Sequence, residues 1–173
     1  MNRLAWLNGL RVDEAERELL RCCGSTAWAR AMAEKRPFSS EAGLTTAADD
    51  LWWALAPNDW LEAFAAHPRI GNKKDVARQE GDAKRWAQGE QAGADAATTA
   101  TLKGLAEANA AYDRKFGHIY IVCATGKTAE EMLALCRARL ENAPHDELRI
   151  AAEEQRKITR IRLDKLLHPE VSP

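Results

Sequence analysis

Alanine dominates this chain, and its abundance constrains the fold more than any other feature of the sequence. The 173 residues include 33 alanines, against 10 glycines and 6 prolines. Alanine loses the least side-chain entropy in a helix, and few helix breakers interrupt the chain. An apolar fraction of 46% is enough to build a core, and the length is that of one domain. We therefore expect a single domain over residues 1–173 that folds as an all-α, multi-helix bundle.

The charges nearly cancel, with 25 basic and 26 acidic residues. No field of one sign is available to hold a polyphosphate, so a nucleic-acid partner is not expected. No run of about 18 uncharged apolar residues predicts a membrane span. Residues 1–10 lack the long apolar run and the cleavage site of a signal peptide, and residues 171–173 do not form a peroxisomal signal. We expect a cytoplasmic protein.

The cysteines and histidines show no metal-ligand pattern. Neighbouring Cys22 and Cys23 are poorly placed to bridge each other, and Cys123 and Cys136 lie far along the chain. We expect all four to be reduced thiols. The four histidines are scattered, unlike the ligands of a zinc site, so the sequence predicts no metal centre.

Apolar residues spaced near 3.6 residues, together with capping residues, predict most of the helices. The predicted ranges are 12–22, 27–33, 60–66, 94–116 and 146–167, with two more helices beginning at Asp49 or Asp50 and at Thr128. Thr128 and Glu131 fit a capping box, in which each side chain bonds the other residue's backbone N–H.

Two segments are predicted not to be helical. Residues 73–93 are polar and contain Gly81 and Gly89, so we expect a mobile surface segment. Residues 117–126 form a short apolar run, rich in β-branched residues, between two glycines. Its composition indicates a buried strand, although extended buried chain has the same pattern.

His67 is the first candidate for chemistry. It ends a predicted helix, and Pro68 and Gly71 shape the chain directly after it. An imidazole at such a corner can project into a cleft, and its pKa lies near neutrality, as general acid–base catalysis requires. The alternative is a histidine that only interacts with the dipole at the end of its helix.

Two further candidates are polar residues in unusual settings. Glu90 and Gln91 stand between glycines, and a carboxylate beside an amide suits a cyclic ureide, whose N–H and C=O groups alternate. The alternative for Glu90 is a solvated loop. Arg162 shares a helix face with Ile158, whereas Arg160 points elsewhere, and a cation on a buried stripe needs a partner. That partner is either Glu90 or a substrate carboxylate.

Trp52, Trp53 and Trp60 lie within nine residues of each other. Without a surrounding excess of Lys and Arg, packing in the core is favoured over a base-stacking platform. A non-catalytic helical module that docks a partner protein through this aromatic region is the alternative to an enzyme.

Taken together, several motifs in order resemble the OHCU decarboxylase family, where OHCU is 2-oxo-4-hydroxy-4-carboxy-5-ureidoimidazoline. The motifs are His67-Pro68-Arg69-Ile70-Gly71, Gly89-Glu90-Gln91-Ala92-Gly93, residues 115–124 and residues 157–163. Residues 7–8, 23–28 and 36–38 also resemble that family, so the resemblance covers nearly the whole chain. The resemblance implies an all-helical fold and an assembly that is commonly a homodimer. It also implies an enzyme that decarboxylates OHCU to (S)-allantoin in urate breakdown, without a cofactor or metal.

The resemblance also implies roles for individual residues. His67 matches the family's catalytic histidine and would act as acid and base, while Glu90 and Arg162 match its active-site glutamate and arginine. Substrate-contact positions correspond to Pro68, Gln91, Ile119, Tyr120, Ile121, Val122 and Cys123. Many members have a serine where this chain has Ala87, so a hydroxyl contact to the substrate is missing or replaced. The family also implies that the run from Ile119 is a loop or helix edge, which disagrees with the strand. A lyase for another cyclic ureide is a second alternative.

Overall fold

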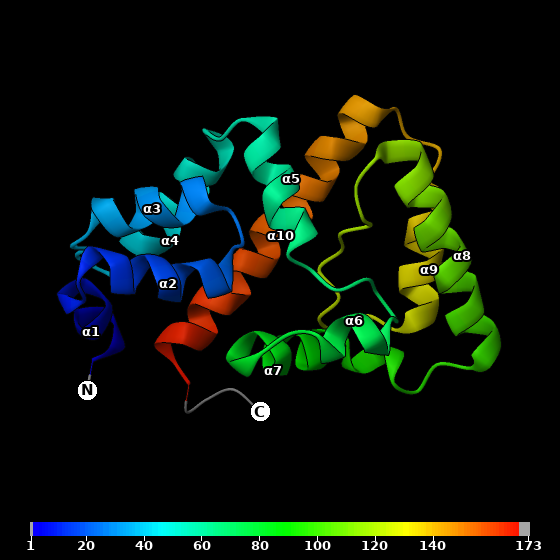
Figure 1. Ribbon diagram of the computed structural model, residues 1–173, viewed down its shortest axis with the longest axis horizontal. Helices are drawn as coiled ribbons and strands as arrows, with labels where there is room; N and C mark the ends of the chain where they lie inside the picture. Colours follow the sequence, from blue (N-terminus) through cyan, green and yellow to red (C-terminus); the bar gives the residue numbers. More distant parts are fainter. Residues whose placement is uncertain (1, 170–173) are drawn as a thin grey trace. The chain divides into compact units, whose positions relative to one another are not determined.

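The computed structural model describes residues 2–169, and over this range the chain is all-α (Figure 1). It holds ten α-helices and one short 3-10 helix, and these residues form no strand. The prediction from the alanine content is therefore confirmed. No helix within residues 2–169 is long and apolar enough to cross a bilayer. Met1 and residues 171–173, on which part of the localisation argument depends, lie outside the described residues.

Contacts between residues divide the chain into two compact units. The first consists of residues up to 63 together with those from 156 onward, and the second of residues 64–155. Two helices, α5 (Pro57–Ala65) and α10 (Pro144–Leu167), contribute to both. We describe each unit by itself, and the single domain over residues 1–173 stays a prediction.

The first unit is built from α1 (Arg3–Gly9), α2 (Val12–Cys22), α3 (Thr26–Lys35), α4 (Glu41–Trp53) and the adjoining parts of α5 and α10. Tryptophans fill its core, as predicted. The indole N–H of Trp28 donates to the carbonyl of Ala48 (3.0 Å), and that of Trp60 donates to the carbonyl of Trp52 (3.0 Å). Both bonds satisfy a buried donor and fix the ring in place. Of Trp52, Trp53 and Trp60, only Trp53 reaches the surface, with 37% of its area exposed.

The predicted start of the aromatic helix was wrong. Helix α4 begins at Glu41, because the Ser40 hydroxyl caps it by accepting from the backbone N–H of Gly43 (3.0 Å). Asp49 lies near its end and binds Arg156 (2.9 Å) and Arg160 instead of capping. Helix α5 likewise begins at Pro57 rather than Trp60, since proline fits the first turn of a helix.

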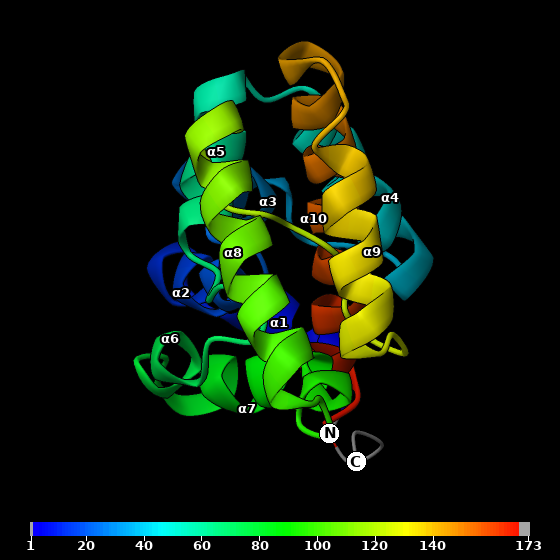
Figure 2. The same cartoon turned by 90° about the vertical axis from the view of Figure 1, so that its right-hand side faces the viewer.

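The second unit holds α6 (Lys73–Ala77), α7 (Gly81–Glu90), the 3-10 helix η1 (Ala92–Ala94), α8 (Thr99–Phe116) and α9 (Ala129–Arg139). Helices α8 and α9 lie side by side in Figures 1 and 2. They approach closely at Gly104, where an added Cβ would lie 2.9 Å from a methyl carbon of Leu133. The capping box at Thr128 is confirmed.

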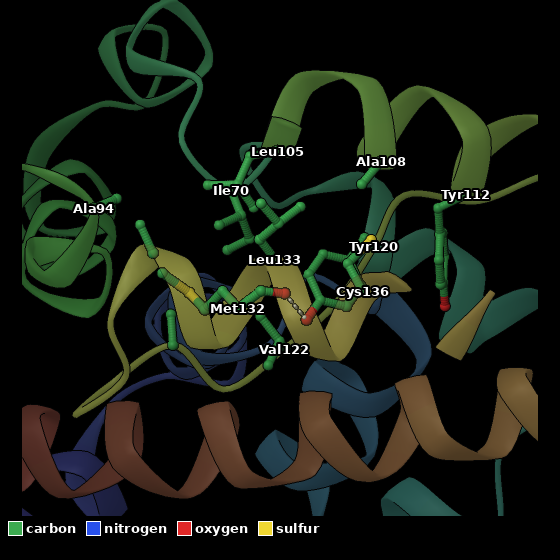
Figure 3. Close-up of a cluster of buried hydrophobic side chains, with 12 residues drawn as sticks. Ile70, Ala94, Leu105, Ala108, Tyr112, Tyr120, Val122, Met132, Leu133 and Cys136 are labelled. Atoms are coloured by element: carbon green, nitrogen blue, oxygen red, sulfur yellow. Dashed lines mark hydrogen bonds between the residues drawn. The ribbon is translucent and has the colours of Figure 1, made fainter. Parts of the chain in front are cut away.

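A buried cluster forms the core of this unit (Figure 3). Leu105, Ala108 and Tyr112 from α8 face Met132, Leu133 and Cys136 from α9. Tyr120 and Val122, from the chain between the two helices, complete it. The Tyr120 hydroxyl donates to the carbonyl of Met132 (3.0 Å), which anchors that chain to α9.

Most of residues 73–93 lie in α6, α7 and η1, which the sequence did not predict as helices, and the mobility of the segment stays a prediction. The Asn72 side chain caps α6 by accepting from the backbone N–H groups of Lys74 (3.1 Å) and Asp75 (3.2 Å). Gly81 stands in the left-handed region, with φ of 55°, at the start of α7. Gly81 therefore lies at the start of α7 and Gly89 lies inside it, one residue before its end, so neither glycine breaks the helix. Helix α8 starts at Thr99 and not at residue 94, because Thr98 caps it.

Residues 117–126 contain no strand, so that interpretation was wrong and the alternative of extended buried chain is correct. Side chains, rather than a neighbouring strand, bond its backbone. Arg139 donates to the carbonyl of Ile121 (2.7 Å), and Lys127 donates to that of Cys123 (2.8 Å). Glu154 accepts from the backbone N–H of Cys123 (2.7 Å). Buried backbone groups need partners, and here distant side chains supply them.

Candidate active site

His67 lies two residues beyond the end of α5, as predicted. Its backbone N–H donates to the carbonyl of Phe64 (3.0 Å), and Pro68 after it is buried. Its ring atom Nε2 lies 2.6 Å from Oε1 of Gln155, a fully buried residue of α10. The imidazole is thus held by a side chain of another helix, a contact that the helix-dipole alternative does not require.

The turn after His67 is joined to the Glu90–Gln91 pair. Gly71 has φ of 77°, a conformation that favours glycine, and its backbone N–H donates to Oε1 of Gln91 (3.1 Å). The Asn109 side chain donates to the carbonyl of Ile70 (3.0 Å) and fixes the same turn from α8. Two of the motifs singled out in the sequence therefore touch each other.

Glu90 is the last residue of α7 and is only 8% exposed, so the solvated-loop alternative is wrong. Gln91 follows it and is 9% exposed. Ala87, one turn before Glu90 on the same helix, is buried and offers no hydroxyl. A carboxylate that has lost most of its water needs hydrogen-bonding partners, which is typical of groups that hold or process a ligand.

The Glu90–Gln91 pair also approaches the chain from Ile119 to Lys127. A Cβ at Gly93 would lie 2.0 Å from the carbonyl oxygen of Lys127, so no side chain fits there. Burial raises the pKa of the Cys123 thiol, and the charges of Glu154 and Glu90 raise it further. The Cys123 thiol is therefore neutral at physiological pH and is not a nucleophile.

A buried polar network supports that chain from behind. Arg139 donates to Glu147 (2.7 Å) as well as to the Ile121 carbonyl, and Asn142 donates to the second oxygen of Glu147 (2.8 Å). Tyr112 donates its hydroxyl proton to Glu147. Burial raises the pKa of Tyr112, which keeps the phenol protonated as a donor. The side chains of Arg139, Glu147 and Tyr112 are all nearly inaccessible to solvent.

A pocket of about 360 Å³ opens beside Gln91. Its lining residues come from the Gly71 turn and from α6, α7, η1 and α8, and include Gly71, Lys84, Gln88 and Leu102. The volume suits a small organic ligand. Gln91 is the predicted site residue that reaches this pocket, and His67 and Glu90 do not line it.

Arg162 belongs to the first unit. It lies on α10, is 8% exposed, and its guanidinium lies 3.5 Å from the carbonyl of Arg21. Ile158 is also buried, while Arg160 is exposed, as the helix-face argument predicted. Burial raises the pKa of neighbouring Cys22 to about 12, although the charge of Arg162 opposes this shift.

All four cysteines are buried free thiols, as predicted. No group of three or more His, Cys, Asp or Glu residues within residues 2–169 is arranged to hold a metal ion.

Four supporting residues were missed by sequence reasoning: Arg139, Glu147, Glu154 and Gln155. Gln155 carried the best available signal, because it lies on the apolar face of its helix, between buried Ala151 and Ile158. The signal in the sequence was weaker for Arg139 and Glu147, because charged residues on helices are usually solvated.

Fold and site together define an all-α protein in which the turn that follows a helix-end histidine contacts a buried carboxylate–amide pair through Gly71 and Gln91. The family model for OHCU decarboxylase matches residues 8–164, and the chain belongs to this family. The family takes its name from a decarboxylase, a carbon–carbon lyase.

Individual relatives agree with this assignment. The chain is 43% identical over 158 residues to the Uric acid degradation bifunctional protein TTL of Arabidopsis thaliana, covering 91% of this chain and 48% of that protein. It is 29% identical over 142 residues to 2-oxo-4-hydroxy-4-carboxy-5-ureidoimidazoline decarboxylase of Amia calva, covering 80% and 79%. A bifunctional uric acid degradation protein of Bacillus sp. (strain TB-90) is 27% identical, with 96% of this chain and 32% of that protein covered. The chain thus spans half or less of the two bifunctional relatives.

Solved structures agree as well. A crystal structure of OHCU decarboxylase in the presence of (S)-allantoin matches with a TM-score of 0.73 and 39% identity, covering 87% of this chain and 96% of that one. A crystal structure of (S)-allantoin synthase has a TM-score of 0.69 at 19% identity, covering 95% and 54%, and supports the fold alone.

Proposed function

We propose that this chain catalyses the cofactor-independent decarboxylation of OHCU to (S)-allantoin in urate breakdown. Family membership supports the reaction, and the related crystal structure is of OHCU decarboxylase in the presence of (S)-allantoin. The observation that carries the proposal is the contact between the Gly71 backbone and Gln91, because it joins the His67 turn to a buried carboxylate–amide pair.

The reaction needs little chemistry from the protein. The substrate has a C=N bond next to the carbon that bears the carboxylate. When CO2 leaves, the electron pair of the broken C–C bond moves into that C=N system, and the former imine nitrogen takes up one proton from solvent. The C4 hydroxyl then loses its proton as its oxygen becomes a carbonyl, and the adjacent ring carbon gains one proton. The protein has to orient the substrate, stabilise the charge that moves, and deliver the proton to one face.

The candidate residues divide these tasks. His67 accepts the proton of the C4 hydroxyl and returns a proton to carbon. Glu90 and Gln91 bind the alternating N–H and C=O groups of the ureide. Arg162, which matches the family's active-site arginine, and backbone N–H groups of residues 119–122 bind the anionic and carbonyl groups.

The remaining features of the proposal follow from the family resemblance and from the near balance of charges. The protein works on a small molecule as a cytoplasmic homodimer, without a metal. The non-catalytic docking module has less support, because Trp52 and Trp60 are 2% and 6% exposed and offer a partner little surface.

Replacing His67 with asparagine tests the catalytic assignment. We expect the enzyme-dependent loss of OHCU to slow by about 100-fold or more, because general acid–base catalysis contributes at least that much. Asparagine keeps a polar side chain, so the thermal unfolding midpoint should stay within a few degrees. The matched control is His145→Asn, at an exposed position on α10, which should leave the rate unchanged. Near wild-type turnover by His67→Asn would reject the role.

A further inference from the structure

We propose that Gln155 is a positioning residue that fixes the tautomer of His67, placing the proton on Nε2 and leaving Nδ1 as the basic nitrogen. The inference deepens the proposed function and, for its catalytic consequence, rests on it. The structural part concerns only two side chains of the second unit and is tested separately.

The geometry sets the direction of the hydrogen bond. Oε1 of Gln155 lies 2.6 Å from Nε2 of His67, and an amide oxygen can only accept. With the amide oxygen facing the imidazole, Nε2 carries the proton. A neutral imidazole has one N–H, so the lone pair belongs to Nδ1. The nitrogen that accepts the substrate proton is thus chosen before the substrate arrives.

The setting of Gln155 explains why this bond is strong enough to select a tautomer. Gln155 has no exposed surface, and its neighbours on the helix face, Ala151, Ala152 and Ile158, are buried as well. A buried amide costs about 1–3 kcal/mol when its hydrogen bonds are lost. In this orientation of the amide, the alternative His67 tautomer would place two acceptors against each other, and turning the amide over would change the other contacts of a side chain that has no exposed surface.

An amide is also the appropriate partner for a base. A carboxylate at this position would attract the protonated imidazolium and keep His67 charged, which would remove its lone pair. Glutamine orients the ring without adding a charge. The adjacent carboxylate, Glu154, bonds the Cys123 backbone instead, so consecutive residues of α10 hold the histidine and the irregular chain.

Nitrogen-15 NMR of the histidine side chains tests the tautomer without any substrate. The wild-type protein, Gln155→Met and Gln155→Glu would be compared at a pH where free histidine is neutral, with His67→Asn used to assign the signals. We expect wild-type His67 to show a protonated Nε2 and an unprotonated Nδ1. In Gln155→Met, which has similar length but no amide, the two tautomers should mix. In Gln155→Glu, Nε2 should stay protonated.

Kinetics separate positioning from a purely structural role. We expect Gln155→Met to lower kcat by about 10–100-fold, as loss of an orienting hydrogen bond does at metal-bound histidines, with KM changed less than about threefold. Far-UV circular dichroism and the unfolding midpoint show whether each variant folds. If Gln155→Met does not fold, wild type and Gln155→Glu still decide the question by NMR.

Two results would overturn the proposal. One is a wild-type His67 protonated on Nδ1, and the other is a folded Gln155→Met variant with an unchanged tautomer. A wild-type protein that shows the expected tautomer but does not consume OHCU would refute the proposed function and leave this structural inference standing.

Discussion

At the scale of single residues, the candidate site combines the half-buried imidazole of His67 with a carboxylate and an amide, those of Glu90 and Gln91, that are almost completely buried. Such groups are expensive to bury unless they are bonded. The described partners, Gln155 for His67 and the Gly71 backbone for Gln91, offset that cost. The site is therefore organised before substrate binds, which reduces the ordering that binding requires.

Glu90 provides a prediction at this scale. Replacing it with glutamine keeps the shape of the side chain and removes the charge that, in the proposed function, orients the ureide N–H groups. We expect kcat/KM to fall at least about tenfold, because a charge-assisted hydrogen bond contributes 1.5–3 kcal/mol. The enantiomeric excess of the product should fall as well, since a poorly held ring exposes both faces.

The control for this change is Glu80→Gln, which removes an exposed carboxylate at the other end of α7. It should leave both rate and stereochemistry as they are. Unchanged rate together with unchanged enantiomeric excess in Glu90→Gln would remove Glu90 from the site.

How much of the site could be predicted differs from residue to residue. His67, Glu90 and Arg162 stood out through their neighbours in the sequence and through the family resemblance. Gln155 and Arg139 did not, because their roles depend on which residues distant in the chain they meet. A glutamine in a helix has the same local sequence whether it binds a histidine or water.

At the scale of elements, the irregular chain between α8 and α9 depends on side chains for its backbone bonds. Arg139 is the most buried of these supports, and it also pairs with Glu147. This arrangement explains why the strand prediction failed. Strand composition reports a preference for extended backbone, but a strand also needs a neighbouring strand, and here α9 and α10 take that place.

Arg139→Gln should destabilise the protein by about 3–5 kcal/mol, because it leaves the Glu147 carboxylate buried without its cation. Urea unfolding measures the change. Arg137→Gln, at an exposed position on the same helix, should stay within about 0.5 kcal/mol of wild type. Similar losses of unfolding free energy in Arg139→Gln and Arg137→Gln would show that the buried pair of Arg139 and Glu147 does not stabilise the protein.

The two glycines that flank the Glu90–Gln91 pair give a matched test of packing. A Cβ at Gly93 would collide with the Lys127 carbonyl, whereas one at Gly89 would meet open space. We expect Gly93→Ala to destabilise the fold by about 1–3 kcal/mol. Gly89→Ala, inside α7, should instead stabilise it by about 0.5–1 kcal/mol. Thermal unfolding that gives both changes the same sign would refute this description of the turn.

Helix prediction succeeded where the 3.6-residue period was clear, as in α2 and α10, and where a capping box marked the first residue, as in α9. It failed over residues 73–93, because α6 and α7 are short, polar and bounded by residues that also favour loops. Their stability comes from caps and from packing of residues such as Ala87, and neither is visible in composition.

At the scale of the whole molecule, composition alone predicted an all-α protein, since 33 alanines and few breakers leave little room for a sheet. The near-zero net charge now has a more specific meaning. A small anionic ureide needs one or two local cations such as Arg162, and not a broad positive field.

The central claim is that this chain converts OHCU to (S)-allantoin. Circular dichroism of the allantoin formed from authentic OHCU, with and without the protein, tests it most directly. We predict faster formation of allantoin with a strong excess of the S enantiomer, and loss of both effects with His67→Asn. Racemic allantoin formed at the same rate in the presence and absence of the wild-type protein would contradict the account.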